Sequence, residues 1–181
     1  GGNPATAMHS ILKTTNGGGT WPVIYNQAGW GLKSRAFTES LHGVAVGDTG
    51  TILITTNGGN TWNSVTPPVI RNFQAVTFTT ADTGFIVGGD SANRTVLKTV
   101  DGGQNWSVII DGPGSVLNAI TFLNPMKGYM AGDSAYLYKT IDGGQNWTQE
   151  FVPNNFYRRF TAINFYNESL GMVVGYDGYN Y

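Results

Sequence analysis

The chain has 181 residues, of which 40% are hydrophobic and 13% aromatic, so it can bury a core and is not intrinsically disordered. Its formal net charge is −1, and no apolar run approaches the roughly 20 residues that span a bilayer. These properties argue against nucleic-acid partners and membrane insertion. The chain has no cysteine, which excludes disulfides and thiol nucleophiles, and it has 26 glycines, which indicate many tight turns between short strands.

The first recurring element along the chain is a turn that closes on tryptophan. It occurs as Thr-Thr-Asn-Gly-Gly-Gly-Thr-Trp in residues 14–21, and three nearly identical copies follow. The tryptophans are 41, 44 and 41 residues apart, a period that is typical of propeller blades. The repeats end at Trp21, Trp62, Trp106 and Trp147, and the last repeat, over residues 160–181, is incomplete.

A second element lies between the tryptophans. It is a phenylalanine, a glycine six residues later and another glycine four residues after that, starting at Phe37, Phe78, Phe122 and Phe165. The segments that end on these phenylalanines alternate apolar and other residues, as half-buried strands do. A small-apolar strand, a Gly-Asp turn, a third strand and a Trp-bearing strand follow in each repeat. The chain is therefore predicted to be all-β, a single β-propeller domain or propeller fragment over residues 1–181, with four-stranded antiparallel blades.

In each tryptophan turn, Asn or Asp is expected to cap the hairpin through its side chain, glycine to supply positive φ, and the ring to pack beneath the turn. The turn resembles the Asp-box, S-x-D-x-G-x-T-W, of sialidases and related propellers. The longer pattern in residues 47–62, G-D-x-G-x-I-L-x-T-T-N-G-G-x-T-W, resembles the photosystem II assembly and stability factor propellers. The residues given this structural role are Asn16, Trp21, Asn57, Trp62, Asp101, Trp106, Asp142 and Trp147.

The resemblance implies an architecture rather than an activity, because Asp-boxes recur across unrelated functions. Similar repeats fill many bacterial secreted and surface proteins, so we expect an extracellular, cell-surface or periplasmic location. Residues 11–25 supply only the last two strands of a blade, and residues 160–175 only the first two. Joined, they would close a ring of four blades, the smallest closed form. We favour the alternative, an excerpt of a larger propeller, because four-bladed rings are rare.

The sequence offers no catalytic constellation and predicts neither a cofactor nor a metal site. His9 and His42 have no partner at metal-ligand spacing and are interpreted as surface or turn residues. Most of the eleven carboxylates fall in predicted turns, and none forms a pair suited to glycoside cleavage. The R-I-P motif of sialidases is missing.

Binding specificity is expected where the repeats differ, because structural positions repeat and loops vary. The connections that lead into the innermost strands should ring one mouth of the central channel. Arginine and aromatic side chains there suit a protein segment or a glycan. In the photosystem assembly relatives an arginine-lined patch is associated with partner binding. Arg71, Arg158 and Arg159 are the residues of this chain that compare with that patch. The candidate rim consists of Trp30, Arg35, Arg71, Asn72, Arg158 and Arg159.

The leading hypothesis is a non-catalytic binding or scaffold module that recognises a protein or a carbohydrate through one face. One alternative is part of a glycoside hydrolase, sialidase-like or other, whose catalytic residues lie outside this chain. Another is a self-assembling surface protein whose edge strands join copies of itself.

Overall fold

The computed structural model describes residues 8–29, 31–150 and 158–177. Its strands form three four-stranded antiparallel sheets and two two-stranded sheets, which confirms the all-β fold class and the repeat as its unit. Blade 1 contains β3 (Leu32–Phe37), β4 (Gly43–Gly47), β5 (Ile52–Thr55) and β6 (Asn63–Ser64). Blade 2 contains β7 (Asn72–Phe78), β8 (Gly84–Gly89), β9 (Asn93–Thr99) and β10 (Ser107–Pro113). Blade 3 contains β11 (Leu117–Phe122), β12 (Gly128–Gly132), β13 (Leu137–Thr140) and β14 (Thr148–Gln149).

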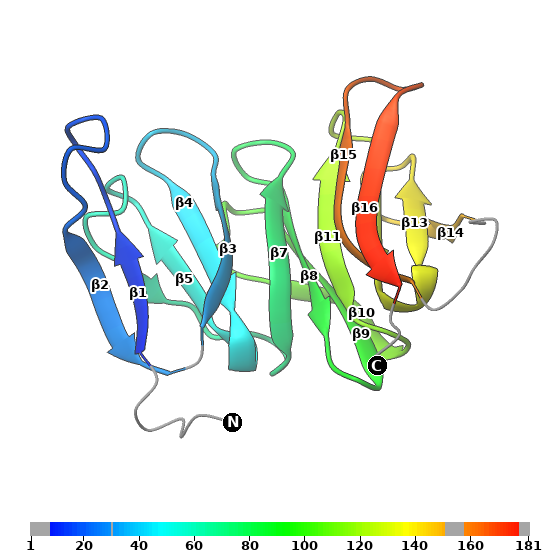
Figure 1. Cartoon of the computed structure of the whole chain (residues 1–181), viewed down its shortest axis with the longest axis horizontal. Helices are drawn as coiled ribbons and strands as arrows, with labels where there is room; N and C mark the ends of the chain where they lie inside the picture. Colours follow the sequence, from blue (N-terminus) through cyan, green and yellow to red (C-terminus); the bar gives the residue numbers. More distant parts are fainter. Residues whose placement is uncertain (1–7, 30, 151–157, 178–181) are drawn as a thin grey trace.

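Two half-blades flank the three complete blades. The first half-blade contains β1 (Met8–Leu12) and β2 (Val23–Ala28), and the last contains β15 (Arg158–Phe165) and β16 (Gly171–Asp177). They lie on opposite sides of the fan of blades in Figure 1 and form separate sheets. The four-bladed ring is therefore not formed in this structure.

The second glycine of each repeat stands where two strands approach closely. A β-bulge interrupts each pairing of first and second strands, for example between Leu117 and Ala119. Opposite that bulge, a Cβ on Gly132 would lie 2.1 Å from the carbonyl oxygen of Val116. The equivalent glycines, Gly47, Gly88 and Gly175, meet the same obstruction. No larger residue fits at this position without moving the backbone.

The first glycine, the phenylalanine and the tryptophan of a repeat form one packing unit. In blade 1 the Phe37 ring lies over Gly43, where a Cβ would come within 2.8 Å of it. Trp62 then meets Phe37 edge-on, with ring centroids 6.1 Å apart. The same edge-on pair forms between Trp106 and Phe78 in blade 2 and between Trp147 and Phe122 in blade 3. The spacing of these residues in the sequence is thus set by ring packing within a blade.

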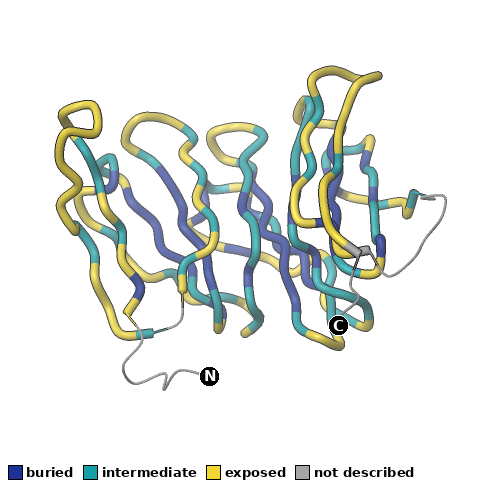
Figure 2. Tube along the Cα trace, viewed as in Figure 1, coloured by how far each residue is buried: buried dark blue, intermediate teal, exposed yellow. Residues whose placement is uncertain are grey.

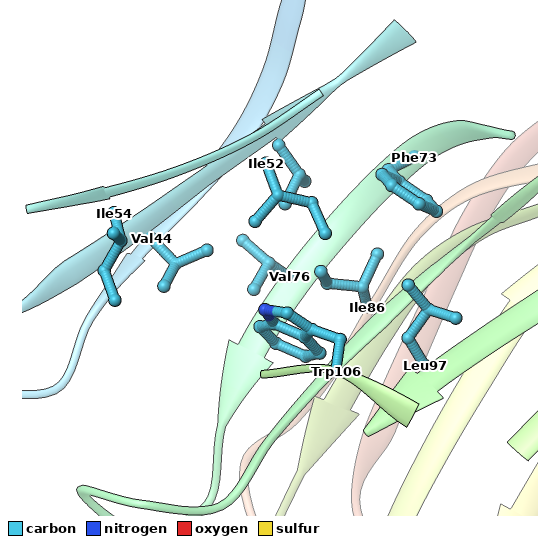
Figure 3. Close-up of a cluster of buried hydrophobic side chains, with 9 residues drawn as sticks. Val44, Ile52, Ile54, Phe73, Val76, Ile86, Leu97 and Trp106 are labelled. Atoms are coloured by element: carbon cyan, nitrogen blue, oxygen red, sulfur yellow. The ribbon is translucent and has the colours of Figure 1, made fainter. Parts of the chain in front are cut away.

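The core lies between neighbouring blades rather than inside one sheet. Figure 3 shows the first such cluster, in which side chains of blades 1 and 2 interlock around Val76 and Trp106. A second cluster, around Phe85 and Met130, joins blades 2 and 3. Burial is concentrated in the middle blades, whereas the half-blades are largely exposed (Figure 2). Each blade is consequently stabilised by its neighbours.

The tryptophan turns have the predicted hydrogen bonds. In blade 1 the Thr55 hydroxyl accepts from the Gly59 amide at 2.9 Å and donates to the Asn57 side chain at 3.0 Å. Asn57 in turn accepts from the backbone amide of Thr61 at 2.9 Å and donates to its hydroxyl at 2.8 Å. Blade 3 reverses this last bond, because Asn146 donates its side-chain amide to Asp142 at 2.8 Å. An Asn cap is paired with Thr and an Asp cap with Asn, which keeps donor and acceptor matched.

The Asp142 cap makes stability dependent on acid pH. Hydrogen bonds from the backbone and side chain of Asn146 and from Thr140 lower the pKa of Asp142 to about 2. The unfolded value is about 3.9, so the stabilisation is fully present above that pH and is lost as the pH falls through about 2. We expect Asp142→Asn to lower the midpoint of urea unfolding at pH 7, and the difference from the parent protein to shrink towards pH 2.

The matched control is the double variant Asp142→Asn with Asn146→Thr, which reproduces the Asn57–Thr61 arrangement. It should recover most of the lost stability. An equal loss in the single and double variants would show that the donor–acceptor match is unimportant.

Candidate functional site

The rim is the end of the blades at which the chain turns from the second strand to the third and passes from one blade to the next. Its turns carry Asp48, Asp90 and Asp133, while the tryptophan turns lie at the opposite end of the strands. In blades 1 and 3 the rim turn is a short 3-10 segment, η1 (Asp48–Gly50) and η2 (Asp133–Ala135). Thr49 and Ser134 adopt positive φ there, of 56° and 58°.

In blades 1 and 3 the bulge residue of the first strand points a polar side chain at the aspartate of its own blade. Lys33 Nζ lies 2.5 Å from Asp48 Oδ1. In blade 3 the Asn118 amide donates to Asp133 at 2.7 Å and also to the Phe160 carbonyl oxygen at 2.8 Å. Asn118 therefore links blade 3 to the last half-blade.

In blade 2 and in the last half-blade, the residue that leads into the first strand contacts the rim turn of the preceding blade. Asn72 accepts a 2.9 Å hydrogen bond from the Thr49 amide. Arg159 occupies the equivalent position in the last repeat, and its Nε lies 2.9 Å from Asp133 Oδ1. Its side chain is still 45% exposed, so this guanidinium joins two blades and faces solvent.

In blade 2 the longer β9–β10 hairpin brings an additional carboxylate, that of Asp111, to the rim. Arg71 forms a two-pronged ion pair with Asp111, with Nε and one terminal nitrogen each 3.1 Å from a carboxylate oxygen. The Thr95 hydroxyl donates to the same carboxylate at 2.8 Å. Arg71 Nε is also 3.6 Å from Asp90. The ion pair between Arg71 and Asp111 thus joins the extended β9–β10 hairpin to the rim.

Asp90 caps the tight turn that replaces the 3-10 segment in blade 2. The Ala92 amide donates to Asp90 Oδ1 at 2.9 Å, and the backbone and side chain of Asn93 donate to it as well. The Ala92 hydrogen bond makes the largest contribution to lowering the pKa of Asp90, and Arg71 adds to it. The carboxylate is consequently an acceptor held in its charged form.

The structure brings only some of the predicted rim residues together. Arg71 and Asn72 lie at one junction between blades, and Arg159 lies at another. Arg35 is exposed but sits farther along β3, opposite Ala45, beside Phe37 and Trp62. Trp30 lies outside the described residues, as does the side chain of Arg158.

Sequence reasoning missed the acidic partners of these arginines. In the sequence, Asp111 lies outside the turn positions that the repeats share, and Asp133 lies in a predicted Gly-Asp turn. The 44-residue spacing between Trp62 and Trp106 was the available signal for Asp111, because the three extra residues extend the hairpin that carries it.

Both histidines contact other residues within the fold. His42 lies in a turn, as predicted, and one ring nitrogen is 2.6 Å from the Gly102 carbonyl oxygen of the next blade. The prediction that His9 is a surface residue is wrong, since it is buried and stacks on Tyr25 with ring centroids 5.6 Å apart. Among the described residues, no group of three or more acidic, histidine or cysteine side chains is placed to hold a metal ion. The described part of the chain also has no helix long and apolar enough to cross a membrane.

Comparison with known proteins supports the predicted resemblance. Residues 31–110 match the family model of photosynthesis system II assembly factor YCF48. A YCF48 structure with a bound D1 peptide is 29% identical to this chain, with a TM-score of 0.61 over 70% of the chain. YCF48 from Cyanidioschyzon merolae is 23% identical, with a TM-score of 0.55 over 74% of the chain. The chain spans 41% and 60% of the lengths of these two proteins.

Two glycoside hydrolases share the fold. An ancestral GH74 enzyme is 20% identical, with a TM-score of 0.69 over 85% of this chain and 23% of its own. The GH74 enzyme of Niastella koreensis is 18% identical, with a TM-score of 0.61 over 81% of this chain and 26% of its own. At these identities the likeness establishes architecture alone. No curated protein matches the chain.

Proposed function

We propose that this chain is a non-catalytic module that binds an extended segment of a protein partner at its rim. The observation that carries the proposal is the 29% identity to a propeller that binds a peptide, YCF48 with its D1 peptide. The rim supports it because its side chains differ from blade to blade while the residues that build the blades recur.

Arg159 is the side chain best placed to contact such a segment. Its Nε faces Asp133, which fixes the side chain across the junction between blade 3 and the last half-blade. A guanidinium carries five N–H donors, so further donors remain to meet backbone carbonyls or a carboxylate of the partner. A pre-oriented arginine loses less side-chain entropy on binding than a free one.

The rim carboxylates support a binding role rather than hydrolysis. Asp48 meets Lys33, Asp133 meets Asn118 and Arg159, and Asp111 meets Arg71. Each carboxylate is thus occupied as an acceptor. A glycosidase instead needs one protonated and one ionised carboxyl that face a single bond.

The test is a titration of the chain with the D1 peptide that binds the YCF48 relative, followed by fluorescence anisotropy. We expect saturable binding, and we expect Arg159→Ala to weaken it at least about tenfold, which corresponds to about 1.4 kcal/mol. Lys13→Ala is the matched control, because it removes one positive charge at the opposite end of the blades, where Lys13 bonds Asn60.

Equal affinities for the parent chain, for Arg159→Ala and for Asn72→Ala would show that the partner binds elsewhere than at the rim. Glycan-array binding without peptide binding would support a carbohydrate-binding module instead.

A further inference from the structure

An arginine at the junction between blades 2 and 3 has no negatively charged partner among the described residues. Arg94 lies in β9, next to the rim turn of blade 2, and pairs across the sheet with Gly112. Its Nε is buried and has no hydrogen-bond partner in this part of the chain. By contrast, the rim cations Lys33, Arg71 and Arg159 each lie beside a carboxylate. A buried charged donor without a partner is costly, so a negatively charged ligand would stabilise it.

The surroundings of Arg94 hold its guanidinium in place without neutralising it. Its Cζ lies 6.0 Å from the ring centroid of Tyr136 and 5.6 Å from that of Tyr138, and both rings belong to blade 3. The two rings are stacked, with centroids 5.7 Å apart. Cation–π contacts of this kind attract the positive charge but supply no negative one. Burial raises the pKa of Tyr138, and the charge of Arg94 offsets this rise only in part, so the phenol is neutral at pH 7 and is not a counter-ion.

Space for the Arg94 side chain exists because the neighbouring residue after the hairpin is glycine. A Cβ on Gly114 would lie 2.7 Å from a terminal nitrogen of Arg94. Gly114 also has a positive φ of 151°, which few other residues adopt. The next residue, Ser115, forms a 2.9 Å hydrogen bond with Ser134 of blade 3. One hydroxyl of this pair donates to the other, so the second hydroxyl proton remains available. The junction therefore offers both guanidinium and hydroxyl donors.

We propose that the junction between blades 2 and 3 binds one carboxylate group, which pairs with the guanidinium of Arg94. The fork of guanidinium N–H donors matches the two oxygens of a carboxylate. A phosphate group fits less well, because it carries about −1.5 to −2 charges at pH 7. Asp111, which bonds the adjacent Thr95, and Asp133 already place negative charge near this junction. Every residue of the site lies within or between two complete blades.

The inference deepens the proposed function and rests on it for the source of the carboxylate. A protein segment carries carboxylates on its acidic side chains and at its C-terminus. The junction of Arg94 lies between that of Arg71 and that of Arg159 along the rim. A segment that extends along the rim from one to the other therefore passes Arg94. We expect the partner to present an acidic side chain at this point.

The test follows the Nε–H resonance of Arg94 by NMR spectroscopy while small probes are added to the chain. N-acetylglutamate α-amide carries a side-chain carboxylate, and N-acetylglutamine amide is the matched probe without it. The first probe should shift the resonance saturably, and the second should not. N-acetylglycine carries only a terminal carboxylate, so its relative affinity distinguishes a C-terminus from a side chain. Arg71 is the internal control, because its Nε already bonds Asp111 at 3.1 Å and its resonance should shift little.

Urea unfolding provides a second measurement of the same site. N-acetylglutamate α-amide should raise the unfolding midpoint of the parent chain, because a ligand that binds only the folded state stabilises it. Arg94→Lys keeps the charge but loses the fork of donors, so it should remove this rise. Arg35→Lys is the matched control, because Arg35 lies in blade 1 opposite Ala45, and it should retain the rise.

The outcomes separate this inference from the proposed function. An Arg94 resonance that neither carboxylate probe shifts, or a stronger response to inorganic phosphate, would overturn the carboxylate site and leave peptide binding at the rim intact. Saturable binding of a carboxylate probe by a chain that does not bind the D1 peptide would support this site and refute the proposed function.

Discussion

Replacing Trp106 by alanine is expected to destabilise the protein by about 3–5 kcal/mol, the range found for large aromatic residues in cores. The ring is 8% exposed and meets Phe78 edge-on at 6.3 Å. Its Nε1 donates to the Gly103 carbonyl oxygen at 3.0 Å. The substitution therefore removes apolar contacts between blades 1 and 2, leaves a cavity and leaves an acceptor unpaired. Urea unfolding monitored by circular dichroism measures the loss.

Trp21→Ala is the internal control for this prediction. Trp21 occupies the same repeat position but is 55% exposed, because the first half-blade has no phenylalanine to meet it. Its removal should cost less than about 1 kcal/mol, as is usual for exposed sites. Equal losses for the two variants would show that the tryptophan contributes through its own turn and not through packing within and between blades.

Gly132→Ala is expected to destabilise the protein by about 3 kcal/mol, at the upper end of the cost of overpacking. Gly132 has a φ of −160°, which any residue adopts, so conformational strain makes no contribution. The cost arises because the new Cβ would lie 2.1 Å from the Val116 carbonyl oxygen, and the backbone at the bulge must move. Thermal unfolding by calorimetry provides the measurement.

Gly112→Ala separates this clash from the general effect of losing a glycine. A Cβ on Gly112 meets no atom within 4 Å. The substitution should therefore be close to neutral, or slightly stabilising through the entropy of the unfolded chain. A similar loss in both variants would refute the view that the close approach of strands selects glycine at the second position.

The fold was largely predictable because its determinants are local and repeated. The alternation in residues 117–122 predicted β11, and the spacing of Phe122, Gly128 and Gly132 is set by contacts within one sheet. The Asp-box turns were predictable for the same reason, since Thr140, Asp142 and Asn146 bond one another within seven residues.

The candidate site was predictable only as a region. The divergence of the repeats singled out Arg71 and Arg159, but their partners Asp111 and Asp133 lie 40 and 26 residues away along the chain. The first pair depends on the length of the β9–β10 hairpin and the second on how blade 3 meets the last half-blade. The 44-residue spacing between Trp62 and Trp106 is a signal for the first pair, whereas the second pair has no signature in the spacing of one repeat.

The amino-acid sequence was enough to predict the blade, because period-two alternation, turn residues and the Phe–Gly–Trp packing unit act within about forty residues. The exposure of individual side chains was not predictable in this way, because it depends on how one blade packs on the next. The same repeat position is buried as Val46 and exposed as Val174. A propeller buries its apolar surface between blades, so the exposure of each position depends on whether a neighbouring strand or blade packs against it in the structure.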